Sequence, residues 1–454
     1  MSTADRRPHV LIVGGGFAGL GAARTLAKSK DVRVTLLDRN NYHQFQPLLY
    51  QVATSQLTGT GVAYSFRALF HKHPHVDVKL VEVASIDPAA CTITTTGGET
   101  WAGDAVVLAA GSQPNFFGTP GADRHSFPLY SLDDAERLRS RIIAVFEAAD
   151  RDPSLVDRGA LNFVVVGGGP TGVETAGALA DMIKQTMRVE YRDLAVKKAT
   201  VHIIDLGHAL LAPFSDRAHD YVAKVLRSKG VELHLEVKVT EVAPGRVTLA
   251  DGTTIDTRCV VWGGGIMAPP VAAAAGLPQG PGGRIDVLPD LTVEGFPRVY
   301  AVGDVANIRD QEGDPLPQLG SVALQSGVWA ARNLLADFAG GQRHPFQYKD
   351  KGIMAMIGRS GLGGGAAIAA MGKKRREVHG PIAFAAWLGV HAMLMTGVRT
   401  RIETFIDWLW AYFSKTRGPQ VMNRADAAQI DWDEEGATET APADAGRSAV
   451  TSSG

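Results

Sequence analysis

The sequence predicts an α/β protein in which two parallel-sheet domains are followed by a helical C-terminal region. Two observations predict this architecture. A strand, a glycine-rich turn and a helix occur in that order near residue 9 and again near residue 161, and an aromatic amphipathic segment follows both. With 454 residues, of which 45% are hydrophobic and 20% charged, the chain is long enough for two or three globular domains.

The overall composition argues against several classes of protein. The formal net charge of −1 gives no sign of a nucleic-acid partner, and two cysteines, Cys91 and Cys259, are too few for a disulfide framework or a C-x-x-C motif. The apolar run at the N-terminus, Val10 to Val13, is too short for a signal peptide. We therefore expect a reducing compartment, and a chain that folds from about residue 8 on the cytoplasmic side.

The first glycine-rich turn lies in HVLIVGGGFAGLGAARTLAK (9–28). In the spacing G-x-G-x-x-G, Gly14 allows a tight turn, Gly16 lets a pyrophosphate approach the backbone, and Gly19 lets the helix pack on the strand. Free N–H groups at the start of the helix then face the phosphates. The next predicted strand ends in Asp38, whose carboxylate can bind ribose hydroxyls. This order of elements predicts a Rossmann-like dinucleotide site.

The same order recurs in LNFVVVGGGPTGVETAGALADM (161–182), where Gly167, Gly169 and Gly172 have the same spacing. The strand that follows the predicted helix ends in Asp205. An acid at this position, where a site for NADPH carries an arginine, favours NADH over NADPH. Basic residues earlier in the segment leave that choice open.

Two such cradles, about 150 residues apart, suggest FAD in the first and a nicotinamide dinucleotide in the second. Predicted strands that end in Ala110-Gly111, in Gly265 and in Gly303-Asp304 supply further edges of the two sheets. The carboxylate of Asp304 can hydrogen-bond the ribityl hydroxyls of a flavin. Capping the start of a helix is its other interpretation, and the two are compatible.

These residues resemble the two-dinucleotide-domain flavoprotein oxidoreductases and, within them, the type II (non-proton-pumping) NADH:quinone oxidoreductases. The resemblance covers about residues 8–422, and its most specific parts are YHQFQPLLYQVAT (42–54) and the aromatic C-terminal segment. It is also carried by GGGFAGL (14–20), GGGPTGVETAGALA (167–180), AVGDVA (301–306) and YKDKGIMAMIGR (348–359).

The resemblance implies that NADH binds over the flavin and passes a hydride to it, after which a membrane quinone receives two electrons without proton pumping. The residues expected to bind FAD are Gly14, Gly15, Gly16, Phe17, Ala18, Gly19, Asp38, Arg39, Gln46, Val83, Ala110, Gly111, Gly303, Asp304 and Ala323. The residues expected to bind NADH are Gly167, Gly169, Pro170, Thr171, Gly172, Glu174, Asp205 and Gly265.

The quinone-side motif departs from the family pattern. The family places Ala-Gln-x-Ala-x-Gln beside the flavin, whereas this chain has GSVALQ (320–325). Ala323 and Gln325 match the pattern, but Ser321 replaces the first glutamine with a side chain about two bonds shorter. We expect Ser321 and Gln325 on the quinone side. The replacement leaves open which quinone is used, and whether another acceptor such as an electron-transfer protein takes its place.

Glu174 is the candidate catalytic residue. The resemblance places it near the nicotinamide and the flavin, where it can relay a proton toward the quinone, because quinone reduction consumes two protons. The alternative is an acid in the first part of a helix that is stabilised by the helix dipole.

Other residues with chemical potential are less convincing. Sulfide:quinone oxidoreductases share the expected fold and use flavin-facing cysteines, but apart from Arg258 no basic residues are placed to make a thiolate of Cys91 or Cys259. The histidines of HKHPH (71–75) predict a solvated loop, and we expect no metal site. His43 either lines the flavin site or packs as a hydrogen-bonded histidine.

The C-terminal region contains two apolar segments. The first, PIAFAAWLGVHAMLMTGV (381–398), has 18 residues without a full charge, but His391, its alanines and its glycines make it a poor membrane-spanning helix. The second, RIETFIDWLWAYFSKTRG (401–418), places apolar residues at helical spacing on one face: Ile402, Phe405, Ile406, Leu409 and Phe413.

Aromatic and basic residues accompany that stripe. Trp408, Trp410 and Tyr412 flank it and are residue types that favour the lipid headgroup layer. The cations Lys373, Lys374, Arg375, Arg376, Lys415 and Arg417 suit anionic lipid. Periodicity alone favours a core or dimer helix. The segment lies at the end of a chain that resembles quinone reductases, and this instead favours an in-plane membrane anchor. A homodimer contact through part of the same surface stays an alternative.

We expect a discontinuous FAD-binding domain at 8–130 and 280–350, an NADH-binding domain at 131–279, a membrane-associating region at 351–422 and a disordered acidic tail at 423–454. The predicted protein is a peripheral FAD-dependent NADH:quinone oxidoreductase on the cytoplasmic face of the cell membrane. The alternatives are a soluble NAD(P)H-dependent FAD reductase with another acceptor, and a nucleotide-binding redox sensor whose tail recruits partners.

Overall fold

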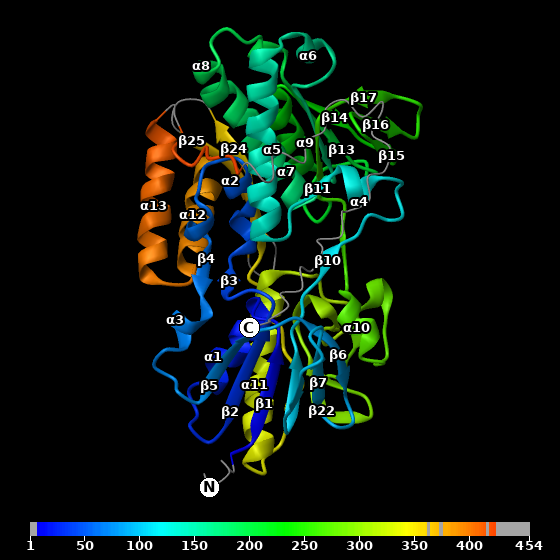
Figure 1. Ribbon diagram of the computed structural model, residues 1–454, viewed down its shortest axis with the longest axis vertical. Helices are drawn as coiled ribbons and strands as arrows, with labels where there is room; N and C mark the ends of the chain where they lie inside the picture. The colour runs from blue at the N-terminus through cyan, green and yellow to red at the C-terminus, as the bar shows by residue number, and fades with distance from the viewer. Residues whose placement is uncertain (1–6, 361–363, 372–375, 415–416, 424–454) are drawn as a thin grey trace, which may run out of the picture.

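The computed structural model of the chain describes residues 7–360, 364–371, 376–414 and 417–423. Two sheets, one above the other in Figure 1, form the body of the molecule, and two C-terminal helices lie along one side. This arrangement confirms the predicted α/β class. The part of the predicted tail at 424–454 lies outside the described residues.

The first sheet combines strands from both halves of the chain. Its order is β21 (Thr292–Val293), β22 (Phe296–Ala301), β9 (Ala105–Leu108), β1 (His9–Val13), β2 (Arg33–Asp38) and β5 (Val76–Leu80). All neighbours are parallel except β21 and β22. The central strands are apolar along their length because both faces of the sheet are covered.

Helices α1 (Phe17–Leu26) and α11 (Gly320–Phe338) pack together on this sheet, and Figure 1 shows them behind it. A Cβ atom at Gly327 would lie 1.9 Å from the carbonyl oxygen of Ala18, so only glycine permits this approach. An antiparallel sheet of β6 (Val83–Asp87), β7 (Thr92–Thr95) and β8 (Thr100–Ala102) accompanies the first domain.

The second sheet is wholly parallel. Its order is β11 (Phe127–Pro128), β18 (Cys259–Trp262), β12 (Asn162–Val166), β13 (Thr200–Ile204) and β14 (Val231–His234). Its helices are α5 (Leu132–Arg151), α7 (Pro170–Met182) and α9 (Asp216–Ser228). A smaller antiparallel sheet of β15 (Val239–Ala243), β16 (Arg246–Leu249) and β17 (Thr254–Asp256) follows β14.

A third sheet of β24 (Ile353–Ser360), β25 (Gly364–Met371) and β26 (Arg376–His379) is antiparallel and packs on α7. A Cβ atom at Gly177 would lie 2.1 Å from the carbonyl oxygen of Ile357, so the strand backbone rests directly on the helix. The segment that resembles the family at 348–359 therefore connects the first domain to α7.

The two domains are joined by an antiparallel ribbon of β10 (Gln113–Pro114) and β19 (Ile266–Met267). Beside it, the indole N–H of Trp262 at the end of β18 donates to the carbonyl oxygen of Asn115 at 2.9 Å. The other short elements are β3 (Tyr42–Gln44), α2 (Leu49–Ala53), β4 (Ala63–Ser65), α3 (Phe66–Phe70), α4 (Ala122–His125), α6 (Ser154–Asp157), α8 (Arg188–Glu190), α10 (Pro270–Ala274), β20 (Ile285–Asp286) and β23 (Ala306–Asn307).

The C-terminal region forms α12 (Pro381–Leu394) and α13 (Val398–Phe413), separated by Gly397 with φ +90°. Among the described residues, no helix is long and apolar enough to cross a membrane. After α13 the chain returns to the second domain, where Arg139 donates to the carbonyl oxygen of Val421 at 3.1 Å.

Candidate functional site

The first glycine turn has the geometry that a dinucleotide requires. Gly14 has φ +93°, and a Cβ atom there would lie 2.4 Å from the carbonyl oxygen of Ala109. A Cβ atom at Gly19 would lie 1.7 Å from the carbonyl oxygen of Gly14, so the helix rests on the turn. Around Gly16 no protein atom lies within 4 Å of the equivalent position. No side chain caps the start of α1, which leaves its first N–H groups available for phosphate oxygens.

Asp38 holds this turn from the end of β2. Its carboxylate accepts from the N–H of Gly15 at 2.6 Å and from the N–H of Asn40 at 2.7 Å. Burial raises the pKa of Asp38, while these two bonds and the charge of Arg39 oppose the shift. The backbone of Asp38 also accepts from Val81 at 2.9 Å, which brings the start of the strand at Val83 beside it.

A chain of hydrogen bonds connects Asp304 with residues that the sequence did not indicate. The Ser112 hydroxyl donates to the Asp304 carboxylate at 3.2 Å and lies 2.7 Å from the Tyr130 hydroxyl. Gln46 donates to the carbonyl oxygen of Tyr130 at 3.2 Å. Burial raises the pKa of Asp304, and Ser112 opposes the shift. Ser112 directly follows the predicted Gly111, but nothing in the sequence points to Tyr130.

The turn at Gly303, from the second half of the chain, packs against the start of α1 after the first glycine turn. A Cβ atom at Gly303 would lie 2.9 Å from Cβ of Ala18 and 3.4 Å from Cβ of Ala323. Residues predicted from three distant segments therefore meet at one place. The N–H of Gly303 donates to the Ser326 hydroxyl at 3.0 Å, which fixes the turn to α11.

His43 lies beneath the first turn as a packed residue. Its Nδ1 atom is 3.0 Å from the carbonyl oxygen of Gly15, and its ring meets Phe17 edge to face. Burial lowers the pKa of His43 to about 4. The imidazole is therefore neutral at pH 7 and supports the turn, as the interpretation of a packed, hydrogen-bonded histidine expects.

The second glycine turn has the same backbone construction as the first. Gly167 has φ +111°, and a Cβ atom at Gly172 would lie 1.8 Å from the carbonyl oxygen of Gly167. The position beside Gly169 is again open within 4 Å. The predicted Pro170 and Thr171 form the exposed first turn of α7.

Asp205 and Gly265 border this second turn. The Asp205 carboxylate accepts from the N–H of Gly168 at 2.5 Å and from the N–H of Gly207 at 2.6 Å. Gly265 has φ +155°, and a Cβ atom there would lie 2.8 Å from the Phe117 ring. Both turns thus have the open space, free amides and acidic border that fit a dinucleotide.

Glu174 lies on the inner side of α7. Its carboxylate accepts from the N–H of Met356 at 2.9 Å, and the Trp387 ring adjoins it. Burial raises the pKa of Glu174 to about 8, although these two neighbours favour the charged form. The group is therefore buried and mostly protonated at pH 7, which favours a role in proton transfer over stabilisation of a charged acid by the helix dipole.

A cavity extends from Glu174 to the C-terminal helices. The residues that line it include Tyr50, Glu174, Met356, Phe384, Leu388 and Trp408. Its wall is mainly apolar, and the family-specific segment at 42–54 contributes to it through Tyr50 and Gln51. The cavity thus brings the candidate acid together with both of the most specific parts of the sequence.

Two residues that were predicted to face lipid instead attach α13 and the segment after it to the rest of the protein. Trp408 is only 5% exposed, and its indole N–H donates to the Gln51 side chain at 2.7 Å. The guanidinium of Arg417 donates to the carbonyl oxygen of Thr54, and burial lowers its pKa to about 10. The prediction that Trp408 lies in the headgroup layer and that Arg417 meets lipid was wrong, because helical periodicity cannot tell which side of a helix meets the protein.

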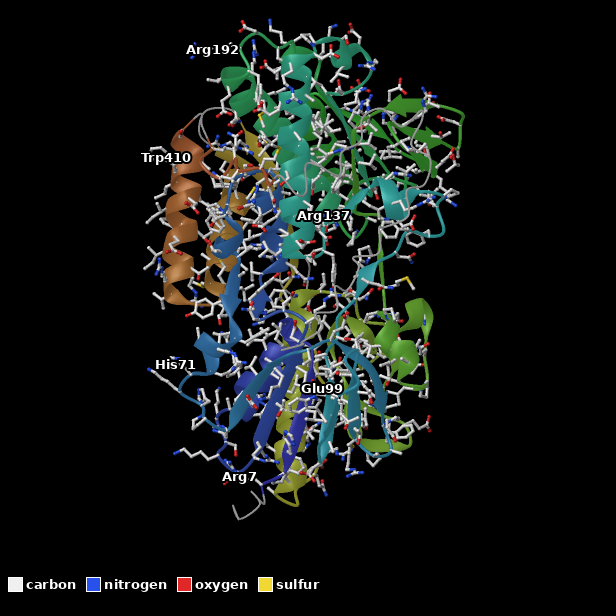
Figure 2. All side chains as sticks on the ribbon, in the orientation of Figure 1. Arg7, His71, Glu99, Arg137, Arg192 and Trp410 are labelled. Carbon is white, nitrogen blue, oxygen red and sulfur yellow. The ribbon has the colours of Figure 1, made fainter. Side chains whose placement is uncertain are left out.

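The predicted stripe on α13 is exposed along Ile402, Phe405, Ile406 and Leu409, while Thr404 lies on the buried side. Figure 2 shows Trp410 at the outer edge of the same helix, where it is 64% exposed. Arg376 is exposed on β26. Lys373, Lys374, Arg375, Lys415 and the side chains of Tyr412 and Phe413 lie outside the described part.

Ser321 and Gln325 bind the segment before β24. The Ser321 hydroxyl is 2.9 Å from the Tyr348 hydroxyl. The Gln325 amide donates to the carbonyl oxygen of Lys349 and accepts from its N–H, each at 3.0 Å. Both side chains therefore position this segment as it approaches α7.

Neither cysteine is prepared for thiolate chemistry. Both side chains are buried. Burial raises the pKa of Cys91, and it raises the pKa of Cys259 to about 12. The cysteines therefore lack the thiolate character that sulfide oxidation needs.

Comparison with known proteins agrees with the geometry. Residues 8–327 match the family model described as pyridine nucleotide-disulphide oxidoreductase. The chain is 36% identical over 428 residues to the type II NADH:quinone oxidoreductase Ndh of Mycobacterium tuberculosis, which covers 91% of this chain and 90% of that protein. It is 27% identical to the demethylphylloquinone reductase NdbB of Synechocystis, over 89% of this chain and 96% of that protein.

A solved structure gives the same result for the fold. NDH2 from Plasmodium falciparum, in complex with NADH, superimposes with a TM-score of 0.83. The match covers 91% of this chain and all of that chain at 19% identity. At so low an identity, the likeness shows a shared fold alone.

Proposed function

Because this chain belongs to the type II NADH:quinone oxidoreductases, within the pyridine nucleotide-disulphide oxidoreductases, we propose that it oxidises NADH and reduces a membrane quinone through bound FAD. The observation that carries this proposal is the combination of two matched glycine turns with a cavity lined both by Glu174 and by the C-terminal helices. When bound, FAD supplies the acceptance and release of electrons that no side chain provides.

The first turn is the proposed FAD site. The N–H groups at Phe17, Ala18 and Gly19 bind the pyrophosphate, and Asp38 binds the adenosine ribose. Asp304, held by Ser112, binds the ribityl chain. We propose 8–130 and 280–350 as the two parts of this domain, because their strands share the first sheet.

The second turn is the proposed NADH site, in the domain at 131–279. The N–H groups at the start of α7 bind the pyrophosphate beside Thr171, and the Asp205 carboxylate accepts from the ribose hydroxyls. A 2′-phosphate would meet that negative charge, so Asp205 favours NADH over NADPH. The exposed position of Pro170 and Thr171 suits a substrate that must leave after each turnover.

Glu174 is the proposed proton donor on the quinone side. A pKa of about 8 keeps the carboxyl group mostly protonated at neutral pH, so it holds a proton at the wall of the cavity. Quinone reduction requires two protons, and a group with a pKa near the working pH is suited to deliver one. Ser321 and Gln325 contribute by fixing the segment that leads to β24.

The C-terminal helices are the proposed contact with the membrane, in the region 351–422. Most exposed large hydrophobic side chains of the described residues lie on α12 and α13, among them Ile382, Met393, Leu394, Val398, Ile402, Phe405, Ile406, Leu409 and Trp410. Such a surface is costly in water and suits an in-plane anchor. We propose a peripheral position on the cytoplasmic face of the membrane, where a lipid-dissolved quinone has a short path to the cavity.

The experiment that tests the function is anaerobic mixing of the purified protein with NADH, followed by a short-chain quinone. We expect NADH to bleach the flavin absorbance and the quinone to restore it. Bleaching without recovery on quinone addition would contradict quinone reduction and favour another acceptor. A failure to bleach would contradict the NADH site.

Cosedimentation with vesicles of anionic phospholipid tests the membrane contact. The double substitution Phe405→Glu and Ile406→Glu places two charges on the exposed stripe, and we expect it to abolish vesicle binding. Leu80, which is 60% exposed at the end of β5, provides the control Leu80→Glu, for which binding is kept. If the double variant changes the oligomeric state but not vesicle binding, the stripe is a homodimer contact instead.

A further inference from the structure

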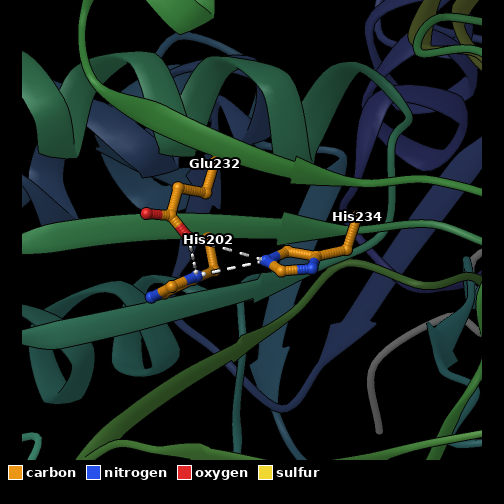
Figure 3. Close-up of side chains that lie close together, drawn as sticks. All are labelled: His202, Glu232 and His234. Carbon is orange, nitrogen blue, oxygen red and sulfur yellow. Dashed lines mark hydrogen bonds and ion pairs between the residues drawn. The ribbon is translucent and has the colours of Figure 1, made fainter. Parts of the chain in front are cut away.

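Three side chains with metal-binding atoms that belong to neither glycine turn converge on the second sheet. His202 comes from β13, and Glu232 and His234 come from β14. His202 is paired in register with Glu232, and His234 is two residues further along the same strand. Because side chains alternate along a strand, all three project from one face of the sheet, and Figure 3 shows them pointing toward one another.

The ligand atoms already have the spacing of a metal site. Nδ1 of His202 lies 3.2 Å from Nε2 of His234 and 3.3 Å from a carboxylate oxygen of Glu232, and the last two atoms are 4.0 Å apart. A point in their plane about 2.1 Å from all three atoms exists, and this equals the usual length of Zn–N and Zn–O bonds.

Hydrogen bonds alone cannot satisfy all the contacts among these three side chains. One nitrogen, Nδ1 of His202, faces both a ring nitrogen and a carboxylate oxygen, and it can carry a proton for only one of these contacts. Its other nitrogen, Nε2, is buried and has no hydrogen-bond partner among the described residues, and the residue as a whole is 8% exposed. A cation accepts lone pairs from all three ligand atoms at once.

Solvent reaches one side of the cluster. The side chain of Glu232 is 59% exposed, so water can occupy the remaining coordination positions.

We propose that His202, Glu232 and His234 form a binding site for a divalent transition-metal ion of the zinc class. Two imidazoles and one carboxylate suit Zn²⁺, whereas Mg²⁺ and Ca²⁺ prefer sites made of oxygen atoms. This differs from the expectation from the sequence, which contained no metal motif. The carbonyl oxygen of His234 accepts from the N–H of Asp205 at 2.9 Å, so the ion is attached to the strand ends that carry the proposed ribose acid.

Zinc binding to the full-length flavin-containing protein tests this proposal. The protein is first freed of metal with EDTA and then titrated with ZnCl₂ in competition with a chromophoric chelator. We expect about one site per chain, and at least about tenfold weaker binding in His202→Gln, Glu232→Gln and His234→Gln. Ca²⁺ and Mg²⁺ added in excess are expected not to compete.

A matched control comes from the other histidine cluster. His73 and His75 have ring centroids 5.9 Å apart, but Nε2 of His75 is 3.1 Å from the carbonyl oxygen of Ala27. His73→Gln should therefore leave zinc affinity unchanged. If His202→Gln does not fold, Glu232→Gln still tests the site, because its side chain is largely exposed.

Two results would overturn the proposal. The first is the absence of zinc binding by the parent protein at micromolar concentration, and the second is equal zinc affinity in the parent and Glu232→Gln. Anomalous diffraction at the zinc edge, from crystals grown with ZnCl₂, should place one peak between the three side chains. A peak at 71–75 with none at His202 would assign the zinc to the other histidines.

Discussion

The two glycine turns have the same backbone construction but differ in what covers them. In each, an acid at the end of the second strand accepts from the middle glycine, Asp38 from Gly15 at 2.6 Å and Asp205 from Gly168 at 2.5 Å. The start of the helix after the first turn packs against residues from distant parts of the chain, with Ala18 buried, whereas Pro170 and Thr171 at the start of α7 are exposed. One local motif can therefore serve two roles: the packed helix start suits a cofactor that stays, and the exposed helix start suits a substrate that exchanges.

Adding a methyl group at the open position of each turn tests this comparison and should give the largest effect. Gly16→Ala and Gly169→Ala meet no protein atom within 4 Å, so both variants should fold. Each methyl group would occupy the space of a pyrophosphate. We expect Gly16→Ala to lose its flavin and all activity, and Gly169→Ala to keep its flavin while its KM for NADH rises at least about tenfold.

The ratio of flavin to protein absorbance, together with the KM for NADH, measures this difference. Gly97→Ala is a control, because its nearest neighbour would be 3.7 Å away and it lies in the exposed turn after β7, outside both glycine turns. Loss of flavin from Gly169→Ala would show that the two turns have been assigned to the wrong ligands.

Removing the acid of the second turn should have the next largest effect. Asp205→Ala deletes the acceptor for Gly168 and Gly207 and the proposed contact with the ribose. Hydrogen bonds to a charged group contribute about 1.5–3 kcal/mol, so we expect the KM for NADH to rise roughly 10- to 100-fold. Flavin content should stay constant, and Asp205→Asn, which keeps one acceptor oxygen, should lie between the parent and the alanine variant.

The pH dependence of stability tests the state of Glu174. Its folded pKa of about 8 lies above the value in an unfolded chain, so the folded state holds the proton that the unfolded state has lost. The free energy of unfolding should therefore fall as pH rises from 7 to 8, by roughly 1 kcal/mol from this group. Glu174→Gln keeps an acceptor for the N–H of Met356 and should lack this slope.

Urea unfolding of both proteins at pH 7 and pH 8 measures that difference. His43 and His391 do not interfere, because burial lowers the pKa of each to about 4 and their unfolded values lie below this window. Identical slopes in parent and variant would mean that Glu174 is ionised in the folded protein, and its role as proton donor would fail.

Restoring the family residue at the quinone-side motif should have the smallest effect. Ser321→Gln adds a longer amide and replaces the contact with Tyr348. We expect a change of a few-fold in the KM for a short-chain quinone, in line with about one neutral hydrogen bond, and no change in the KM for NADH. An equal change in both values would show that Ser321 acts on the whole fold and not on the quinone side.

Local chemistry explains why much of the site was predictable. The glycine turns depend on residues a few positions apart, whose steric demands are the same wherever the motif occurs, and the structure shows them at Gly14, Gly19, Gly167 and Gly172. The exposed stripe on α13 was also predictable, because helical spacing defines a face. The side of that helix that meets the protein was not predictable, since Trp408 is buried there and donates a hydrogen bond to Gln51.

The amino-acid sequence was enough to predict the α/β class, the two dinucleotide turns with their acids, and the likeness to quinone reductases, because each rests on neighbours along the chain or on a continuous motif. The protonation of Glu174, the network of Ser112, Tyr130 and Asp304, and the convergence of His202 with Glu232 and His234 became visible in the folded chain alone. These properties depend on burial and on contacts between residues that are far apart in the chain. Desolvation and close approach exist only once the sheets have packed.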